Sequence, residues 1–302
     1  MEQVKKNSDF WYHVAAFAMI LVWGISFLNT RVLLDAGLTP TEIFVARFTI
    51  AYVSLLIVSR FKVRYTGWRD ELLFVVCGVA GGSAYFIAEN TALELTLISD
   101  VAVLVSTAPL TTALMGAIFY RDERITWMSC LGMIIAFVGS VMLALKNGFV
   151  WGDSISGDLL ALLAAFVWAF YSMALKKLNR TYTTLFITRK LFFYGILSAL
   201  PLLLMEESRI DWQAVKQPEV WGNLLYLGLI CSMAAYFIWG ITVKRIGAVR
   251  ASNYFYLSPI ISMIAAAIWF GERTNAVAYI GCILILGGVI IAEKFKRKPE
   301  IS

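Results

Sequence analysis

Long apolar runs alternate with short charged or turn-rich breaks along the whole chain, and this alternation predicts a set of membrane-spanning helices. A helix needs about 20 mostly apolar residues to cross roughly 30 Å of hydrocarbon. Ten runs reach that length, at about 12–34, 40–59, 71–94, 99–120, 126–145, 157–178, 184–205, 219–243, 249–270 and 275–294. Their continuous apolar character, without alternation at every second residue, excludes an outer-membrane barrel. We therefore predict an all-α integral membrane protein of ten transmembrane helices.

The stretch from Pro109 to Gly139 returns, in altered form, as Pro259 to Gly288. Each copy has a proline that opens an apolar run, an aromatic pair, a Glu-Arg dipeptide and two glycines seven residues apart. The dipeptides Glu123-Arg124 and Glu272-Arg273, and the glycine pairs Gly132/Gly139 and Gly281/Gly288, share one offset of 149 residues. Shorter matches join Phe44-Val45-Ala46-Arg47 to Phe186-Ile187-Thr188-Arg189, and Ala84-Tyr85-Phe86-Ile87 to Ala235-Tyr236-Phe237-Ile238. The chain is a duplication, and we predict two five-helix repeats, 1–147 and 148–302.

An odd number of helices in each repeat gives the second repeat the opposite orientation in the membrane. This is an inverted-topology repeat, an architecture that many secondary transporters share. With the N-terminus inside, the inner connections collect eighteen Lys and Arg residues and the outer ones only four. Basic residues favour cytoplasmic loops, so we expect both termini to be cytoplasmic.

Two five-helix halves, each with the proline, aromatic pair, Glu-Arg and spaced glycines, resemble the EamA family of the drug/metabolite transporter superfamily. The resemblance covers essentially the whole chain. It implies ten helices, a central cavity between the halves and alternating access for a small organic solute, often exported. The repeated motif does not name the solute.

The composition agrees with a membrane protein: 60% of the residues are apolar and 15% are charged. No intramembrane aspartate pair, His-Glu-x-x-His or ATP-binding loop is present, so we expect neither an enzyme nor an ATP-driven pump, and no catalytic residue. The four cysteines have no metal-ligand spacing and His13 is the only histidine, so we expect no metal site and no cofactor. The basic net charge of +6 fits cytoplasmic loops rather than nucleic acid.

Charged residues inside a span are costly and are therefore the first functional candidates. Four qualify: Arg47, Glu89, Arg189 and Lys190. Arg47 and Glu89 fall at similar depths in the outer half of the membrane, and we predict an ion pair between them. One role for this ion pair is a packing or gating bridge that does not touch the solute. The alternative is direct contact with the solute. Arg189 and Lys190 fall in the inner half, as interfacial anchors or, for Arg189, as a carboxylate-binding or gating residue.

Glu89 is the more informative member of the outer pair, because its repeat partner is Gly240 and symmetry does not explain the charge. It is a candidate for proton coupling or for binding the ammonium group of a solute. Asn29 and Asn90 lie at similar depth and are candidates for neutral hydrogen bonds. The alternative is a structural role for all three.

Aromatic side chains form the remaining candidate set. Trp23 and Trp239 lie too deep for an interfacial belt, and aromatic faces attract planar solutes and cations. Plain apolar packing is the alternative for each. Asn253, Tyr254 and Tyr256 precede Pro259, where a kinked helix exposes polar groups to a cavity. The candidates are Trp23, Trp168, Tyr171, Tyr236, Trp239, Asn253, Tyr254 and Tyr256.

The two Glu-Arg pairs are expected to cap helices, and the repeated glycines to permit close helix approach. Together these observations predict a secondary transporter of the bacterial inner (plasma) membrane that moves, and by the resemblance exports, a small amphipathic metabolite such as an amino acid. Proton coupling and a homodimer stay open. The alternatives are an importer or exchanger of a sugar, nucleoside or nucleotide-linked solute, and a membrane scaffold or receptor without transport.

Overall fold

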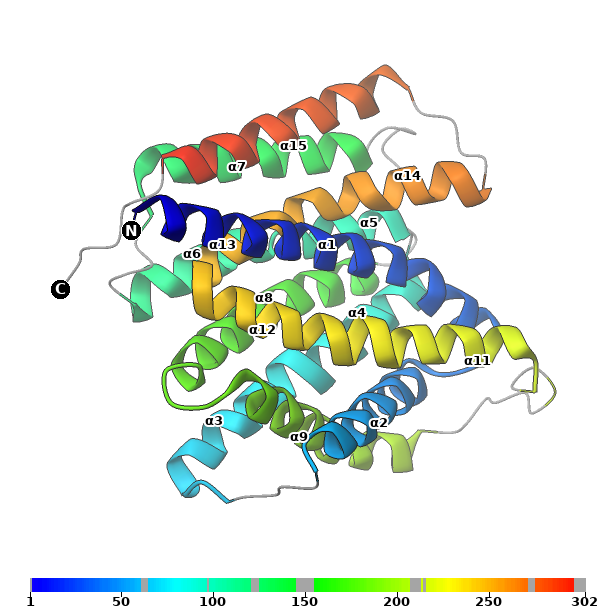
Figure 1. Ribbon diagram of the computed structural model, residues 1–302. Coiled ribbons are helices and arrows are strands. Elements are labelled where there is room, and N and C mark those ends of the chain that lie inside the picture. Colours follow the sequence, from blue (N-terminus) through cyan, green and yellow to red (C-terminus); the bar gives the residue numbers. More distant parts are fainter. Residues whose placement is uncertain are drawn as a thin grey trace.

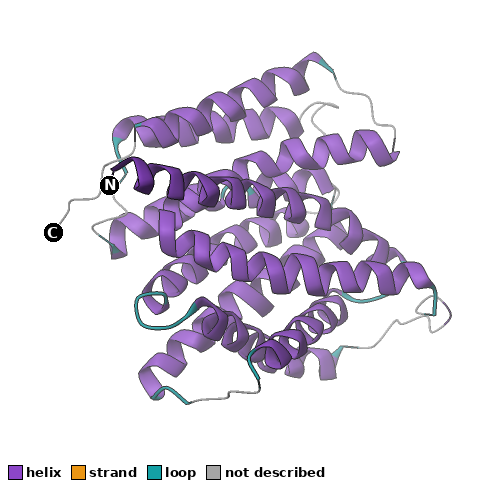
Figure 2. Ribbon diagram, in the orientation of Figure 1, coloured by secondary structure: helices purple, strands orange, loops and turns teal. Residues whose placement is uncertain are grey.

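The computed structural model describes residues 2–60, 65–96, 98–120, 125–144, 155–206, 213, 216–270 and 275–295. Every element within these ranges is helical, and Figure 2 shows the helices lying side by side in a bundle. Both Glu-Arg pairs, Glu123-Arg124 and Glu272-Arg273, lie outside the described residues.

The helices of the first half, which we define as α1 to α7, occupy the predicted positions to within a few residues, except that α1 begins earlier. Two of the predicted spans, the third and the fourth, are built from more than one element. The elements are α1 (Glu2–Asp35), α2 (Pro40–Val58), α3 (Trp68–Gly78), η1 (Val79–Ser83), α4 (Ala84–Leu95), α5 (Ile98–Val105), α6 (Ala108–Phe119) and α7 (Trp127–Ala144).

The second half, α8 to α15, repeats this plan. Again the third and fourth helical segments of the half are composite. The elements are α8 (Ile155–Leu178), α9 (Thr184–Met205), α11 (Pro218–Leu225), η4 (Tyr226–Ala234), α12 (Ala235–Ile246), α13 (Ala248–Ser252), η5 (Asn253–Leu257), α14 (Ser258–Phe270) and α15 (Ala276–Lys294). The elements of both halves thus join into ten helical segments over the described ranges.

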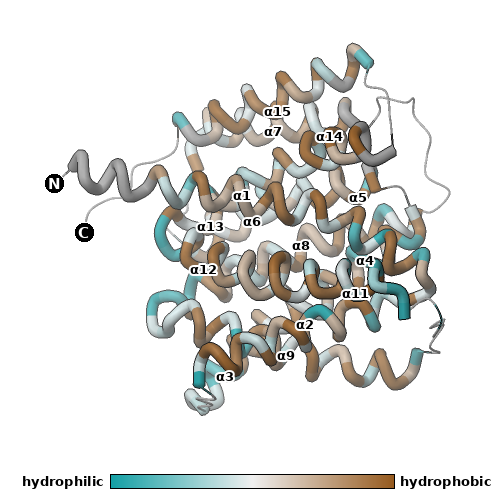
Figure 3. The backbone as a smooth tube through the Cα atoms, turned by 45° about the vertical axis from the view of Figure 1, so that its right-hand side comes forward, coloured by the Kyte–Doolittle hydropathy of each residue, from teal (hydrophilic) through white to brown (hydrophobic). Residues whose placement is uncertain are grey.

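Seven of these segments are long and apolar enough to cross a membrane. Two shorter apolar helices, Trp127–Met142 and Tyr279–Ala292, lie in α7 and α15. Figure 3 shows hydrophobic residues along the helices and hydrophilic ones gathered toward their ends. Many large apolar side chains face outward, among them Leu114, Ile118, Leu204 and Ile283, as expected where lipid rather than water is the solvent.

The irregular turns fall at matching places in the two halves. A π-helical segment, η1 or η4, ends at the residue before each copy of Ala-Tyr-Phe-Ile. The helix that follows in each half is broken in the turn before its proline, Pro109 or Pro259. Proline has no N–H to donate and restricts the residue before it, which explains these breaks. Irregular backbone at membrane depth is tolerated only inside the protein or along a cavity wall. We therefore expect both breaks to lie in the interior of the bundle or beside a cavity.

α7 and α15 pack directly against each other through the repeated glycines, at the top of Figure 1. A Cβ added at Gly288 would lie 2.4 Å from the Ala136 backbone nitrogen and 2.5 Å from the Gly132 carbonyl oxygen. Gly139 meets the carbonyl of Gly281 in the same way, at 2.7 Å. The prediction that these glycines permit close helix approach is confirmed.

Replacing Gly288 by alanine is expected to destabilise the protein by about 2 kcal/mol, because the new methyl group meets backbone atoms that cannot turn aside. Gly287 is the matched control, since nothing lies within 4 Å of a Cβ placed there. Gly287→Ala should leave stability unchanged or raise it slightly. Thermal unfolding in detergent can be followed with a thiol-reactive dye, because Cys77 and Cys231 are buried and free. Equal melting temperatures for the two variants would contradict the close contact.

Candidate functional site

A small cavity lies at the centre of the bundle, between the first and second halves. Its volume is about 20 Å³, which is room for about one water molecule. On α1 the lining residues Ile20, Trp23 and Phe27 are three or four positions apart and so share one helix face. The lining residues are Ile20, Trp23, Ser26, Phe27, Tyr85, Phe86, Glu89, Val105, Trp168, Tyr236, Phe255 and Ser258.

Aromatic rings form most of the cavity wall. The Trp23 ring lies edge-on to Trp168 and Tyr236, with ring centres 5.6 and 5.7 Å apart, and stacks on Phe255 at 5.8 Å. Trp168 also lies 5.0 Å from Tyr85. These separations are typical of favourable aromatic pairs, so the rings hold one another in place. The predicted candidates Trp23, Trp168 and Tyr236 therefore come together here.

Glu89 brings the charge to this cavity. Among the described residues that line it, Glu89 is the one carboxylate, and it is 5% exposed. The Tyr85 hydroxyl, one turn earlier on α4, donates a hydrogen bond to Glu89 Oε1 at 2.6 Å. A buried carboxylate that receives one hydroxyl retains further acceptor positions for a cationic or hydrogen-bonding solute.

The predicted ion pair between Arg47 and Glu89 is not present. Arg47 Nε instead donates to Ser232 Oγ on η4 at 2.9 Å, and its guanidinium carbon lies 4.2 Å from the centre of the Phe86 ring. Its Nη2 has no hydrogen-bond partner in the part of the chain that the structure describes, although Arg47 is only 1% exposed. Similar depth in the membrane was the basis of the prediction, and it does not determine which way a side chain turns. Arg47 turns toward η4, while Glu89 is held by its neighbour on α4.

The two π-helical segments each present a backbone carbonyl to an aromatic side chain of the other half. The Tyr236 hydroxyl donates to the Gly81 carbonyl at 2.6 Å, and Trp23 Nε1 donates to the Cys231 carbonyl at 2.9 Å. Gly81 is required at its position, because an added Cβ would lie 2.4 Å from the Tyr171 ring. Tyr171 thus supports the site from behind, through Gly81 and through Trp168, whose ring centre is 4.8 Å away.

Two indole N–H groups next to the cavity have no partner. Trp168 Nε1 and Trp239 Nε1 are buried and, within the described part of the chain, make no hydrogen bond. The Trp239 ring packs on Trp23, 5.2 Å between centres, but Trp239 is not part of the lining. A buried donor without a partner is costly, so Trp168, which lines the cavity, is suited to donate to an acceptor group of a solute or to a water molecule.

The other predicted polar residues lie away from the lining. Asn90 Nδ2 donates to the Pro40 carbonyl at 3.2 Å, and Asn29 Nδ2 to Asn223 Oδ1 at 2.5 Å. Asn90 thereby ties α4 to the start of α2, and Asn29 joins α1 to α11. Both contacts are consistent with the structural alternative for these residues.

Asn253, Tyr254 and Tyr256 also lie off the cavity lining, although the helix is irregular where the proline predicts. Side chains three residues apart eclipse each other in a 3₁₀ segment, so Phe255 and Ser258 face the cavity together. The three candidates then point elsewhere. The Tyr254 hydroxyl lies 2.7 Å from His13 Nδ1, and Asn253 and Tyr256 are buried among other helices.

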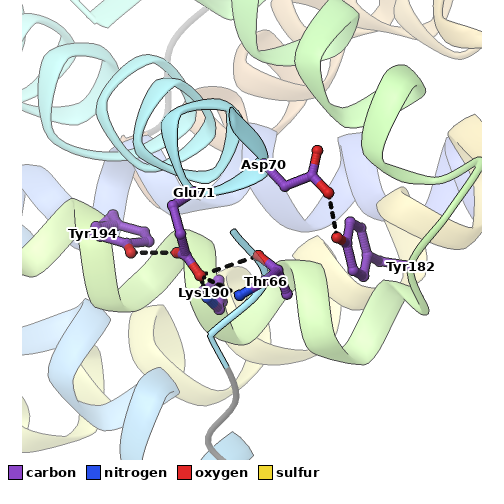
Figure 4. Close-up of polar contacts among 6 residues, drawn as sticks. All are labelled: Thr66, Asp70, Glu71, Tyr182, Lys190 and Tyr194. Carbon is purple, nitrogen blue, oxygen red and sulfur yellow. Dashed lines mark hydrogen bonds and ion pairs between the residues drawn. The ribbon is translucent and has the colours of Figure 1, made fainter. Parts of the chain in front are cut away.

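Arg189 and Lys190 lie in a second polar cluster, at one end of the bundle, which we call the Lys190 end. Lys190 forms a buried ion pair with Glu71 of α3 and is surrounded by the rings of Phe74 and Phe186, with centres 5.0 and 5.4 Å from Nζ. Glu71 also accepts from the Tyr194 hydroxyl and, at 3.0 Å, from the Thr66 hydroxyl and backbone N–H (Figure 4).

Further contacts join the two halves at both ends of the bundle. At the Lys190 end, the Tyr182 hydroxyl donates to Asp70 (Figure 4), and Arg189 Nη1 donates to Ser59 Oγ at 3.0 Å. At the opposite end, Thr39 Oγ1 donates to Glu206 at 3.0 Å, and Asn29 meets Asn223. Polar contacts therefore join the two halves at both ends of the bundle, beyond the central cavity.

The EamA-like transporter family model matches this chain twice, over residues 10–145 and 155–293. Together these matches cover most of the 302 residues.

The chain belongs to the EamA-like transporter family.

EamA-like proteins are transporters rather than enzymes, so the chain is a multi-pass membrane protein that carries a small-molecule solute. A Streptantibioticus cattleyicolor protein named a probable terminal-alkyne amino-acid exporter is 29% identical over 95% of this chain and 97% of its own length. The uncharacterized transporter YdfC of Bacillus subtilis is 27% identical over 90% of this chain and 87% of its own. A solved crystal structure with a TM-score of 0.73 and 23% identity covers 95% of this chain and 97% of its own, and shares the fold.

Several site residues of this EamA-like chain were not among the sequence predictions: Tyr85, Phe255, Ser258, Ser232 and Glu71. Tyr85 carried a usable signal, because it is the repeat partner of Tyr236. The signal for Glu71 was weaker. It is a carboxylate in the first turn of a span, and the predicted topology places that turn on the same side of the membrane as Lys190. Nothing in the sequence marks Ser232 or Ser258 among the chain's other small polar residues.

Proposed function

We propose that this chain exports an amino acid or a related small amphipathic metabolite by alternating access. The observation that carries the proposal is the central cavity, where a buried carboxylate, aromatic faces and an unpaired indole N–H converge. These three kinds of group are complementary to an ammonium, an apolar side chain and a carboxylate.

Each group of such a solute has a partner in the site. Glu89 accepts hydrogen bonds from the ammonium group, and a charge-assisted bond of this kind is stronger than a neutral one. The faces of Trp23, Trp168 and Phe255 attract the cation and cover the apolar part. Trp168 Nε1, which has no partner now, donates to the solute carboxylate. The present cavity of about 20 Å³ is too small for an amino acid, so binding requires the halves to separate.

The Streptantibioticus relative, a probable terminal-alkyne amino-acid exporter, supports both the amino-acid solute and the outward direction. Its likeness extends over almost the whole of both chains, so it includes the segments that line the cavity.

Alternating access needs contacts that break on one side while they hold on the other. The contacts at the Lys190 end and those at the Thr39–Glu206 end are suited to that exchange, since both join the two halves. We propose ten membrane spans in two inverted repeats, 1–147 and 148–302, in the bacterial inner membrane. Cytoplasmic termini follow from the charge distribution and put the Lys190 end inside.

The test is efflux from proteoliposomes loaded with a mixture of amino acids, sugars and nucleosides, with released solutes identified by mass spectrometry. Wild type should release amino acids faster than protein-free vesicles do. Trp168→Phe keeps an aromatic ring and removes the N–H, so it should slow amino-acid efflux by about tenfold, as expected for the loss of one hydrogen bond to a charged group. Phe166→Leu, on the outward face of the same helix and 44% exposed, is the matched control.

Release of sugars or nucleosides with no amino-acid release would reject the amino-acid assignment in favour of the alternative solute class. Absence of flux for every solute would reject transport of this pool. A parallel series with an imposed pH gradient decides whether Glu89 couples proton movement to the solute.

A further inference from the structure

A second cavity, of about 200 Å³, lies at the Lys190 end between α2, α3 and α9. We propose that this cavity binds the phosphate group of an anionic phospholipid, with Arg189 as its main ligand. The site is separate from the central cavity and shares no lining residue with it.

The charge balance of this second cavity leaves one cation uncompensated. Glu71, Lys190 and Arg189 all line it, but Glu71 is paired with Lys190. Arg189 is only 3% exposed and has no ion-pair partner among the described residues. A buried charge without a counterion is unfavourable, so an anion in this cavity would relieve the cost.

The hydrogen-bonding capacity of Arg189 points the same way. A guanidinium has five N–H donors, and within the described ranges Arg189 has one hydrogen bond, from Nη1 to Ser59 Oγ at 3.0 Å. The planar fork of donors suits phosphate oxygens, which accept two parallel bonds. Tyr52 and Tyr65 also line the cavity, and their hydroxyl groups are further possible donors to a phosphate.

The depth of the cavity matches the headgroup region of a bilayer. Arg189 lies five residues from the first residue of α9, Thr184, or about 8 Å along the helix axis. Tyr65 and Trp68, just before and at the start of α3, are 70% and 67% exposed. Exposed tyrosine and tryptophan at helix ends are typical of the interface between lipid and water.

Lipid is favoured over a soluble anion because an outward-facing apolar surface adjoins the cavity. Phe193, which lines it, is 43% exposed, and Leu197, one turn further along α9, is 50% exposed. On α2, Val53 and Ile57 form a matching stripe, 47% and 60% exposed. Tyr52 and Phe193, with ring centres 6.0 Å apart, connect the two stripes at the cavity. Acyl chains along these stripes would place the lipid phosphate at Arg189.

The experiment is native mass spectrometry of purified protein titrated with phosphatidylglycerol, with phosphatidylcholine and glycerol 1-phosphate as separate arms. Wild type should retain phosphatidylglycerol in preference to phosphatidylcholine. Arg189→Gln should weaken that binding about tenfold, because it removes the charge and the fork of donors. Arg180→Gln is the control, since Arg180 is an exposed basic residue at the same end, and it should bind as wild type does.

Arg189→Lys keeps the positive charge and guards against a variant that does not fold. Its affinity for phosphatidylglycerol should fall about threefold, through loss of the bidentate geometry. Unchanged phosphatidylglycerol binding in both Arg189 variants would overturn the site. Glycerol 1-phosphate binding as tightly as the lipid would overturn the lipid assignment and leave a site for a soluble anion. Because binding is measured without transport, failure here leaves the proposed function untouched.

Discussion

Replacing Glu89 by glutamine is expected to slow the efflux of an amine-bearing solute at least tenfold. The substitution keeps the size of the side chain and its hydrogen bond with Tyr85, but it removes the charge that faces the cavity. A hydrogen bond to a charged group contributes about 1.5–3 kcal/mol, and about 1.4 kcal/mol corresponds to a factor of ten. Initial efflux rates from proteoliposomes, at several internal solute concentrations, measure the change.

A comparison of solutes distinguishes recognition of the ammonium from a structural role of Glu89. An N-acetylated analogue lacks the ammonium, so its slow efflux should differ little between wild type and Glu89→Gln. Glu94→Gln makes the same change at an exposed position of the same helix and should leave efflux at the wild-type rate. Equal losses for both solutes would mean that Glu89 supports the fold rather than the solute.

Removal of either partner of the Glu71–Lys190 pair is expected to destabilise the protein by about 3 kcal/mol. Both residues are 8% exposed, so Glu71→Leu leaves an ammonium, and Lys190→Leu a carboxylate, without its counterion. The double variant leaves no unpaired charge and packs leucine among the rings of Phe74 and Phe186. It should therefore recover most of the lost stability. Melting temperatures from dye labelling of the buried cysteines measure all three variants.

The same series tests whether the pair belongs to the contact between the halves. Leucine at both positions preserves burial but removes the electrostatic link between α3 and α9. Efflux should therefore slow, or transport should become equally fast in the two directions across the membrane. If the double variant melts as early as the single ones, the ion pair is not the source of the instability. Arg69→Leu, at the exposed start of α3, is the control for loss of a basic residue at this end.

Much of the fold could be predicted from the sequence. The length of an apolar run reflects the thickness of the membrane, and the repeated glycines reflect close packing between helices. Run length gives the helices to within a few residues over most of the chain. The repeated glycines, Gly132 and Gly288 among them, predict close helix approach but not that α7 and α15 are the partners. The π-helical segments escaped prediction. Val79–Ser83 contains the run Gly81-Gly82-Ser83, which disfavours a regular helix, whereas Tyr226–Ala234 has the composition of an ordinary helix. The two segments therefore share no compositional signal, only their matching position before Ala-Tyr-Phe-Ile.

The candidate site was less predictable, because depth along a helix can be deduced from the sequence and direction around it cannot. Trp23, Glu89, Trp168 and Tyr236 meet at the cavity, while Arg47 at similar depth turns to Ser232. The 3₁₀ turn at Asn253–Leu257 brings forward Phe255, which has no polar group to attract notice. The partner of Lys190 could not be predicted either, because Glu71 lies on α3 in the other half of the chain, 119 residues earlier.

The tight central cavity also limits how fast the protein can work and how well it seals the membrane. A space for about one water molecule between aromatic rings offers no continuous aqueous path across the bilayer. The passage of each solute therefore requires a collective movement of helices, and such movements take microseconds to milliseconds. Turnover is then bounded at roughly a thousand to a million events per second, far below diffusion through an open pore. A cell can hold many copies of this protein in its membrane without discharging the membrane potential.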